Sequence, residues 1–215
     1  MKHFTSTYDR NQYTIAAAEV GLRAMIDEDG SVWYANASGT GATKWTPVKM
    51  KHILLSLNDF FEVDSSGDVA AIAVASGNGG NLAADTTPIK RGDSAESLEL
   101  SWATGNVDPI QAQIGLPDDI DDGQDFYVDL DVNSGTTDAA TMAVETGWNG
   151  GTLVVDSASD AATKSATTHT ITATVAAADV PASPKRLTLA LTPPTHATNA
   201  IQLSRVGLRY YPKAP

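Results

Sequence analysis

Apolar and polar residues alternate with a period of two along several stretches of the chain. In FYVDLDV, residues 126–132, an apolar side chain occupies every second position. The same alternation appears in SLELSW (97–102), HTITATV (169–175) and RLTLALT (186–192). Successive side chains of a strand point to opposite faces, so each run predicts a strand with one buried face. Runs rich in Gly, Pro, Asn and Asp follow these segments, and the spacing predicts an antiparallel jelly-roll β-sandwich.

The last strand, IQLSRVGLRYY, changes phase in its middle. Its inward positions end at Leu203 and resume at Val206, one residue out of step. An extra residue in one strand of an antiparallel pair is a β-bulge. The sequence therefore predicts a bulge near Ser204 and Arg205.

The N-terminal part has a different pattern. LRAMIDEDGSVWYAN contains two short extended runs around Asp29-Gly30, a dipeptide that favours a tight hairpin turn. We expect a small β meander or arm over residues 1–56, followed by the sandwich over 57–215. Alanines at 16–18 favour a short helix over residues 14–20.

Composition excludes several classes of protein. The 215 residues include no cysteine, which excludes disulfides, thiolate metal sites and cysteine nucleophiles. A net charge of -12 argues against a nucleic-acid partner, because phosphates attract Lys and Arg. No stretch approaches 18 consecutive apolar residues, so no membrane segment is expected. The opening residues lack the pattern of a secretory signal, and we expect synthesis and folding in a cytoplasm.

Charge is unevenly distributed between the two parts. Residues 1–56 carry six Lys and Arg against five acidic residues, a net of +1, whereas the remainder carries eight against 21, a net of -13. Such asymmetry indicates a near-neutral part that can approach a partner and an acidic body that stays solvated. The alternative is that one small region simply lacks acidic residues.

The stretch GLPDDIDDGQDF is the densest cluster of acidic residues. It matches part of a calcium loop, with Asp118, Asp122 and Asp129 at the first, fifth and twelfth positions. Apolar residues occupy the third and ninth positions, where such a loop has ligands. The favoured interpretation is a polar connection without a metal, bent by Pro117 and Gly123.

No catalytic set is evident, and we expect a protein that is not an enzyme and has no cofactor. Asp129 and Asp131 lie two apart on one strand face and could serve a glycan depolymerase. Such a pair is also typical of any solvated sheet face. The four histidines have no metal-ligand spacing, and no G-x-S-x-G sequence occurs.

Four tryptophans leave a glycan-binding alternative open. The strand phase places Trp102 in the core, whereas Trp148, in GWNGG, is the candidate for stacking on a sugar. Packing in the core or at its rim is the alternative for all four.

Sequence elements across residues 98–211 resemble a group of tailed-bacteriophage virion proteins. The elements are a Trp-containing strand, the connection GLPDDIDD, the corner AADVP, and LTPPTHATNA leading into the last aromatic strand. EVGLRAMIDEDGSVWYAN similarly resembles short β modules of phage fibre and capsid-associated proteins. These motifs are structural corners, with no catalytic signature among them.

The resemblance implies a capsid cement or decoration protein with a jelly-roll body. Such a protein would lie on the capsid exterior as a homotrimer at local threefold positions, with the major capsid protein as its partner. Lys44, Trp45, Lys49 and Lys51 would form the docking part. A receptor- or glycan-binding module of the virion is the alternative.

Overall fold

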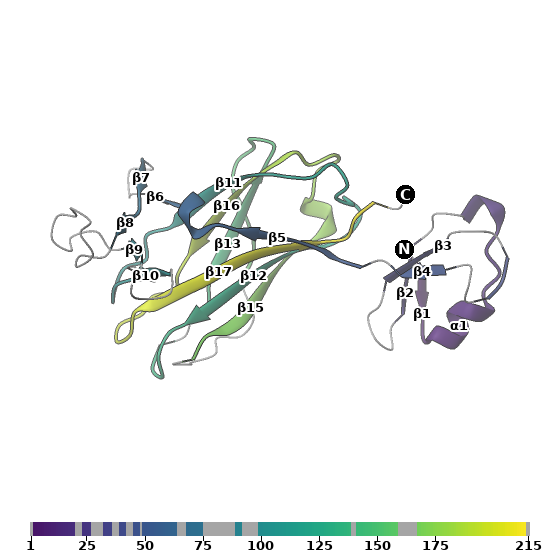
Figure 1. Ribbon diagram of the computed structural model, residues 1–215, viewed down its shortest axis with the longest axis horizontal. Helices are drawn as coiled ribbons and strands as arrows, with labels where there is room; N and C mark the ends of the chain where they lie inside the picture. Colours follow the sequence, from purple (N-terminus) through teal and green to yellow (C-terminus); the bar gives the residue numbers. More distant parts are fainter. Residues whose placement is uncertain are drawn as a thin grey trace. The chain divides into compact units, whose positions relative to one another are not determined.

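The computed structural model consists of two compact units (Figure 1). The smaller unit comprises Met1–Lys51 and Tyr211–Pro215, and the larger comprises His52–Tyr210. The structure describes residues 2–19, 23–26, 32–35, 39–41, 45–47, 49–63, 68–74, 89–91, 99–138, 141–158 and 167–213. Within these residues, no helix has the length and apolar character needed to cross a membrane. The larger unit begins before residue 56, because β5 (Lys51–Leu55) pairs with the last strand of the sandwich.

The smaller unit is built on one sheet in which β2, β3 and β4 form an antiparallel meander. The first strand, β1, pairs in parallel with β2. The expected turn at Asp29-Gly30 lies outside the described residues. The strands of this sheet are β1 (Lys2–Phe4), β2 (Arg23–Ile26), β3 (Val32–Ala35) and β4 (Trp45–Pro47).

The helix predicted over residues 14–20 is found, within the described residues, only as a short 3-10 helix over 17–19. The structure has α1 over Thr7–Gln12 and a short 3-10 helix, η1, over Ala17–Glu19. Between them Ile15 is extended, and it exchanges backbone hydrogen bonds of 2.8 and 2.9 Å with Gly39. Its side chain is buried, so tertiary pairing overrides the local alanine preference.

The larger unit contains two packed sheets, and they are antiparallel apart from the parallel pair β8–β9. One sheet has the order β15-β12-β17-β10-β9-β8, with β5 also paired to β17. The other has the order β14-β13-β16-β11-β6-β7. The chain is therefore an all-β, antiparallel jelly-roll β-sandwich with a small N-terminal β unit, as predicted.

The strands predicted from alternation are confirmed. The two runs HTITATV and RLTLALT coincide with whole strands, and SLELSW is confirmed over its last three residues. The strands of the sandwich after β5 are β6 (Phe61–Val63), β7 (Val69–Ala71), β8 (Ala73–Val74), β9 (Ile89–Arg91), β10 (Leu100–Trp102), β11 (Ile110–Gly115), β12 (Phe126–Asn133), β13 (Ala143–Trp148), β14 (Val154–Ala158), β15 (His169–Val175), β16 (Arg186–Thr192) and β17 (Ile201–Tyr210).

The predicted bulge in β17 is also confirmed. Asp131 of β12 lies opposite Arg205, but the next residue, Val132, lies opposite Leu203. Ser204 is the extra residue, and its hydroxyl donates to the Asp131 carbonyl at 3.2 Å. The bulge lets both halves of β17 bury their apolar side chains.

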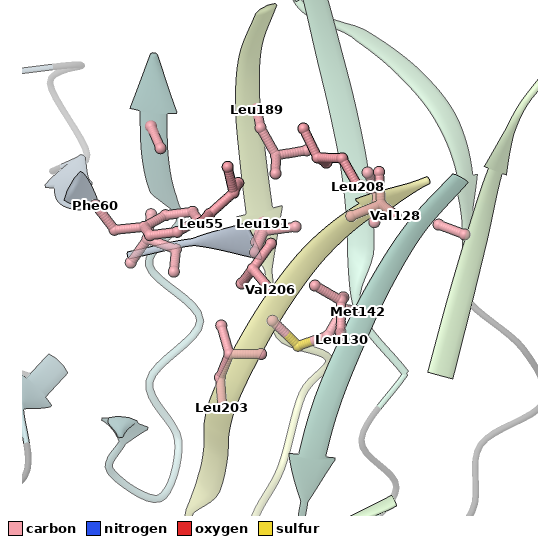
Figure 2. Packing of buried hydrophobic residues seen from close by; sticks show 14 of the residues in the cluster. Leu55, Phe60, Val128, Leu130, Met142, Leu189, Leu191, Leu203, Val206 and Leu208 are labelled. Atoms are coloured by element: carbon pink, nitrogen blue, oxygen red, sulfur yellow. The ribbon is translucent and has the colours of Figure 1, made fainter. Parts of the chain in front are cut away.

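A single apolar core fills the space between the two sheets. Figure 2 shows Val128, Leu130 and Leu208 of one sheet together with Leu189 and Leu191 of the other. Trp102 is fully buried, as predicted, and its indole N–H donates to the Asp108 carbonyl at 2.9 Å.

Burial in this core predicts the stability of two matched leucine variants. Leu130→Ala should lower the free energy of unfolding by about 2–5 kcal/mol, because Leu130 is fully buried and its truncation leaves a cavity. Leu54→Ala, at a side chain that is 69% exposed, should change it by less than about 0.5 kcal/mol. Urea denaturation followed by tryptophan fluorescence measures both. Equal effects of the two substitutions would contradict the assignment of the core.

Candidate functional site

A groove of about 410 Å³ lies on the outer face of the six-stranded sheet, beside the 3-10 helix η3 (Leu57–Asp59). Phe61 and Val69 line it and are 45% and 61% exposed, which is high for large apolar side chains. The other described residues that line the groove are Asn58, Asp59, Gln111, Ala112 and Gln113.

Strand alternation determines which side chains of β11 reach this groove. Ile110, Ala112 and Ile114 are buried, and all three pack in the core. Gln111 and Gln113 therefore point outward, because neighbouring residues of a strand face opposite sides.

The pairing of β6 with β11 places an aromatic ring beside an amide. Phe61 lies directly opposite Gln111, so the two side chains share the outer face. The preceding residue, Phe60, is fully buried. The serine hydroxyl of Ser56 accepts the Asn58 backbone N–H at 3.2 Å and caps η3, which carries Asn58 and Asp59 to the rim of the groove.

The same row of residues continues across the sheet. Gln111 lies opposite Ala190 of β16, and Ala190 lies opposite Glu145 of β13. Ala190 stands between two core leucines in sequence and so belongs to the outer face. Phe61, Gln111, Ala190 and Glu145 thus form one row perpendicular to the strands, which we call the outer row.

The groove combines an exposed aromatic ring with amide and carboxyl side chains. An aromatic ring offers a flat apolar surface, and each amide offers both hydrogen-bond donors and an acceptor. This chemistry suits a ligand that presents apolar faces and hydroxyl groups in alternation.

Asp129 and Asp131, the candidate catalytic pair, are held in ion pairs on the other sheet. Arg205 donates to Asp131 at 2.6 and 3.0 Å, and Thr170 donates to it at 2.6 Å. Arg209 pairs with Asp129 through both Nε and Nη2, and Thr172 donates to the same carboxylate at 2.7 Å.

These contacts set the pKa of both carboxyl groups. Burial raises the pKa of Asp129, but hydrogen bonds from Arg209 and Thr172 outweigh it, and the net shift is downward. The hydrogen bond from Arg205 lowers the pKa of Asp131, against the opposing effect of burial. A general acid needs a raised pKa, so both shifts are in the wrong direction for that role.

The acidic stretch GLPDDIDDGQDF is held by contacts typical of a polar connection. Asp118 pairs with Lys185, and Asp122 accepts the Ser183 backbone N–H at 3.1 Å. Asp129, the third residue of the calcium alternative, is the partner of Arg209. Among the described residues, no group of three or more His, Asp or Glu is arranged to hold a metal ion.

Trp148 lies on the inner face of its sheet, opposite Leu187, and packs against the core. Its ring meets that of Phe126 edge to face, with 5.5 Å between the centroids. The exposed aromatic residue of the groove is instead Phe61, which the sequence analysis did not single out. The run NDFF gave no signal for it, because either phenylalanine could have been the buried one.

The proposed docking residues lie in and beside the smaller unit. Lys49 and Lys51 are exposed. Trp45 lies in β4 opposite Ala35, but its side chain, like the whole of Lys44, lies outside the described part of the chain. The described part of the chain therefore leaves open whether these residues dock to a capsid, and their docking stays a prediction.

His196, in the motif LTPPTHATNA, joins two loops at one end of the sandwich. Its buried ring places Nδ1 2.9 Å from the Pro194 carbonyl oxygen and Nε2 2.9 Å from that of Ala103. Gly105 in turn donates its backbone N–H to the His196 carbonyl at 2.8 Å. The motif is a structural corner, in agreement with its interpretation from sequence.

No protein-family model matches the chain, and no curated protein matches it. Among solved structures, it is similar to a xylan-binding module of the type CBM15, with a TM-score of 0.48, 14% identity and coverage of 77% of this chain and 100% of that chain. It is also similar to a family 35 carbohydrate-binding module from Clostridium thermocellum (TM-score 0.43, 11% identity, 74% and 97% coverage). A third is a mutant Xylanase10C from Cellvibrio japonicus in complex with xylopentaose (TM-score 0.44, 15% identity), of which 28% is covered.

The β-sandwich implied by the resemblance to virion proteins is confirmed by the strand arrangement. The virion origin stays a prediction. The solved structures above have TM-scores below 0.5, so they carry no argument about the ligand of this chain.

The Asp131–Arg205 ion pair predicts a specific acid sensitivity. A carboxyl group whose pKa is lowered on folding stabilises the protein above its unfolded pKa, about 3.9. That contribution is lost as the pH falls through the lower, folded pKa. Asp131→Asn should therefore lower the free energy of unfolding by about 0.5–1 kcal/mol at pH 7, and the difference from the wild type should vanish in strong acid.

Urea denaturation at pH values from 7 down to 2 measures this difference, with Arg205→Gln and the double variant completing a mutant cycle. If the changes in the free energy of unfolding caused by the two single substitutions were additive at pH 7, the ion pair would not contribute to stability.

Proposed function

We propose that this chain is a non-catalytic carbohydrate-binding protein displayed on the surface of a phage particle. The observation that carries the proposal is the pair formed by Phe61 and Gln111 in the outer groove of the sandwich. The proposal rests on the chemistry of this groove rather than on the likeness to solved structures.

A sugar ring presents C–H groups on its faces and hydroxyl groups around its edge. The C–H face can stack on the exposed ring of Phe61 and remove apolar surface from water. The edge hydroxyls can then exchange hydrogen bonds with Gln111 and Gln113, whose amides are both donors and acceptors. An open groove on a rigid sheet binds such a ligand without a large conformational change.

Removal of the aromatic ring tests this proposal directly. Phe61→Ala should weaken binding to a recognised polysaccharide by about fivefold or more, because stacking on a ring contributes at least about 1 kcal/mol. Screening on a glycan array identifies the polysaccharide, and affinity electrophoresis or calorimetry measures the change.

Leu54→Ala is the matched control, because it removes an exposed apolar side chain from the other sheet. It should bind like the wild type. Equal binding by Phe61→Ala would refute the groove as the site.

A second function, stabilisation of the capsid, is supported by the division of charge between the units. The smaller unit has seven Lys and Arg against five acidic residues, and the larger has seven against 21. A homotrimer at a local threefold position would present three copies of the smaller unit to equivalent sites on the shell, so that weak contacts combine. The acidic sandwich would then be displayed to solvent.

Charge reversal at the exposed lysines tests docking to the shell. Lys49→Glu combined with Lys51→Glu should reduce binding to empty shells of the corresponding major capsid protein, most strongly at low salt. Co-sedimentation and the melting temperature of the shells are the measurements. Lys185→Glu, in the sandwich, is the control and should bind normally. Full binding by the double variant would contradict docking through these residues.

A further inference from the structure

The charge on the described lining of the groove is negative. Its polar lining residues, among those described, are two glutamines, one asparagine and one aspartate. None of the described lining residues is Lys, Arg or His. A site for an anionic sugar normally offers a cation to the carboxylate or sulfate, most often Arg in a bidentate contact.

The outer row continues the amide and acidic side chains of the groove as far as Glu145. From Phe61 on β6 to Glu145 on β13 there are three strand-to-strand steps, which together span about 14 Å. Ala190, in the middle of the row, is fully buried, so Phe61, Gln111 and Glu145 are the side chains that the row presents to a ligand. The row therefore has an aromatic ring at one end and, at the other, the carboxyl group of Glu145 in addition to that of Asp59 in the groove.

The net charge of the larger unit also disfavours an anionic ligand. Its seven basic and 21 acidic residues give a net charge of -14. A polyanion would approach against this field, and a carboxylate placed in the row would be near Asp59 or Glu145 without a compensating cation from the lining.

We infer that the groove binds an uncharged polysaccharide along an internal stretch of its chain, laid across the strands over the outer row. This inference rests on the proposed carbohydrate-binding function and specifies its ligand class. One sugar stacks on Phe61, and the amide of Gln111 hydrogen-bonds the next sugar along the outer row. Asp59 and Glu145 accept hydrogen bonds from sugar hydroxyl groups. The same two carboxyl groups exclude uronate and sulfated chains.

The test compares neutral polysaccharides (xylan, mixed-linkage glucan, galactan) with polyanionic ones (alginate, polygalacturonate, a sulfated galactan) by affinity electrophoresis of the full chain. At low salt, at least one neutral polymer should bind about tenfold or more tightly than every polyanion. Its oligosaccharides should bind more tightly as they lengthen over the span of the row, and the monosaccharide should bind weakly.

The double variant Asp59→Asn with Glu145→Gln should raise the ratio of polyanion to neutral affinity by about tenfold at low salt, and salt should reduce this gain. Asp118→Asn with Asp179→Asn changes the net charge equally at exposed positions outside the row, and should leave the ratio unchanged.

Tighter binding of a polyanion by the wild type would overturn the inference while leaving the carbohydrate-binding function intact. An equal gain in both double variants would also overturn it, since net charge alone would then set the preference. Failure to bind any glycan in either class would refute the proposed function itself.

Discussion

The burial of one face of every major strand between two sheets is the constraint on which the rest of the structure depends. In β11 it places Ile110 and Ile114 in the core, and the pleat then leaves Gln111 and Gln113 on the outer face. A shift of the β6–β11 register by one residue would separate Phe61 from Gln111 and turn Phe61 toward the core. The hydrophobic core therefore fixes the groove, although none of its polar lining residues belongs to the core.

The bulge in β17 resolves a conflict between two such requirements. Leu203 and Val206 must both face the core, yet three positions separate them, and an uninterrupted strand would place them on opposite faces. The extra residue, Ser204, restores both contacts and brings Arg205 opposite Asp131. Ion pairs therefore lie on the outer face of this sheet, whereas the outer face of the other sheet has the exposed aromatic ring of Phe61. The two faces thus differ in their exposed side chains for a reason that begins with strand register.

Alternation in the sequence was sufficient to predict the long strands, the bulge and the burial of Trp102, because each depends on the pattern within one strand. The site depended on pairing between strands far apart in the sequence, such as Phe61 with Gln111, and no local pattern encodes this. Phe60 and Phe61 illustrate the limit: the residues are identical, and only the position of η3 and β6 determines that one is buried and the other exposed. The helix expected over residues 14–20 is reduced to a 3-10 helix over 17–19 for a related reason, since the distant partner Gly39 holds Ile15 extended.

The separation of core from groove also determines how the site can change. Phe61 and the outward glutamines contribute little to the core, so the requirements of folding restrict them weakly. Substitutions there can change the chemistry of the groove while Leu187, Leu189 and Leu191 keep the sheet packed on its partner. Ala190 differs from the other residues of the outer row, because it is fully buried although it lies on the outer face. A larger residue at this position would have to displace its cross-strand neighbours Gln111 and Glu145, so packing restricts Ala190 more than it restricts the exposed Phe61.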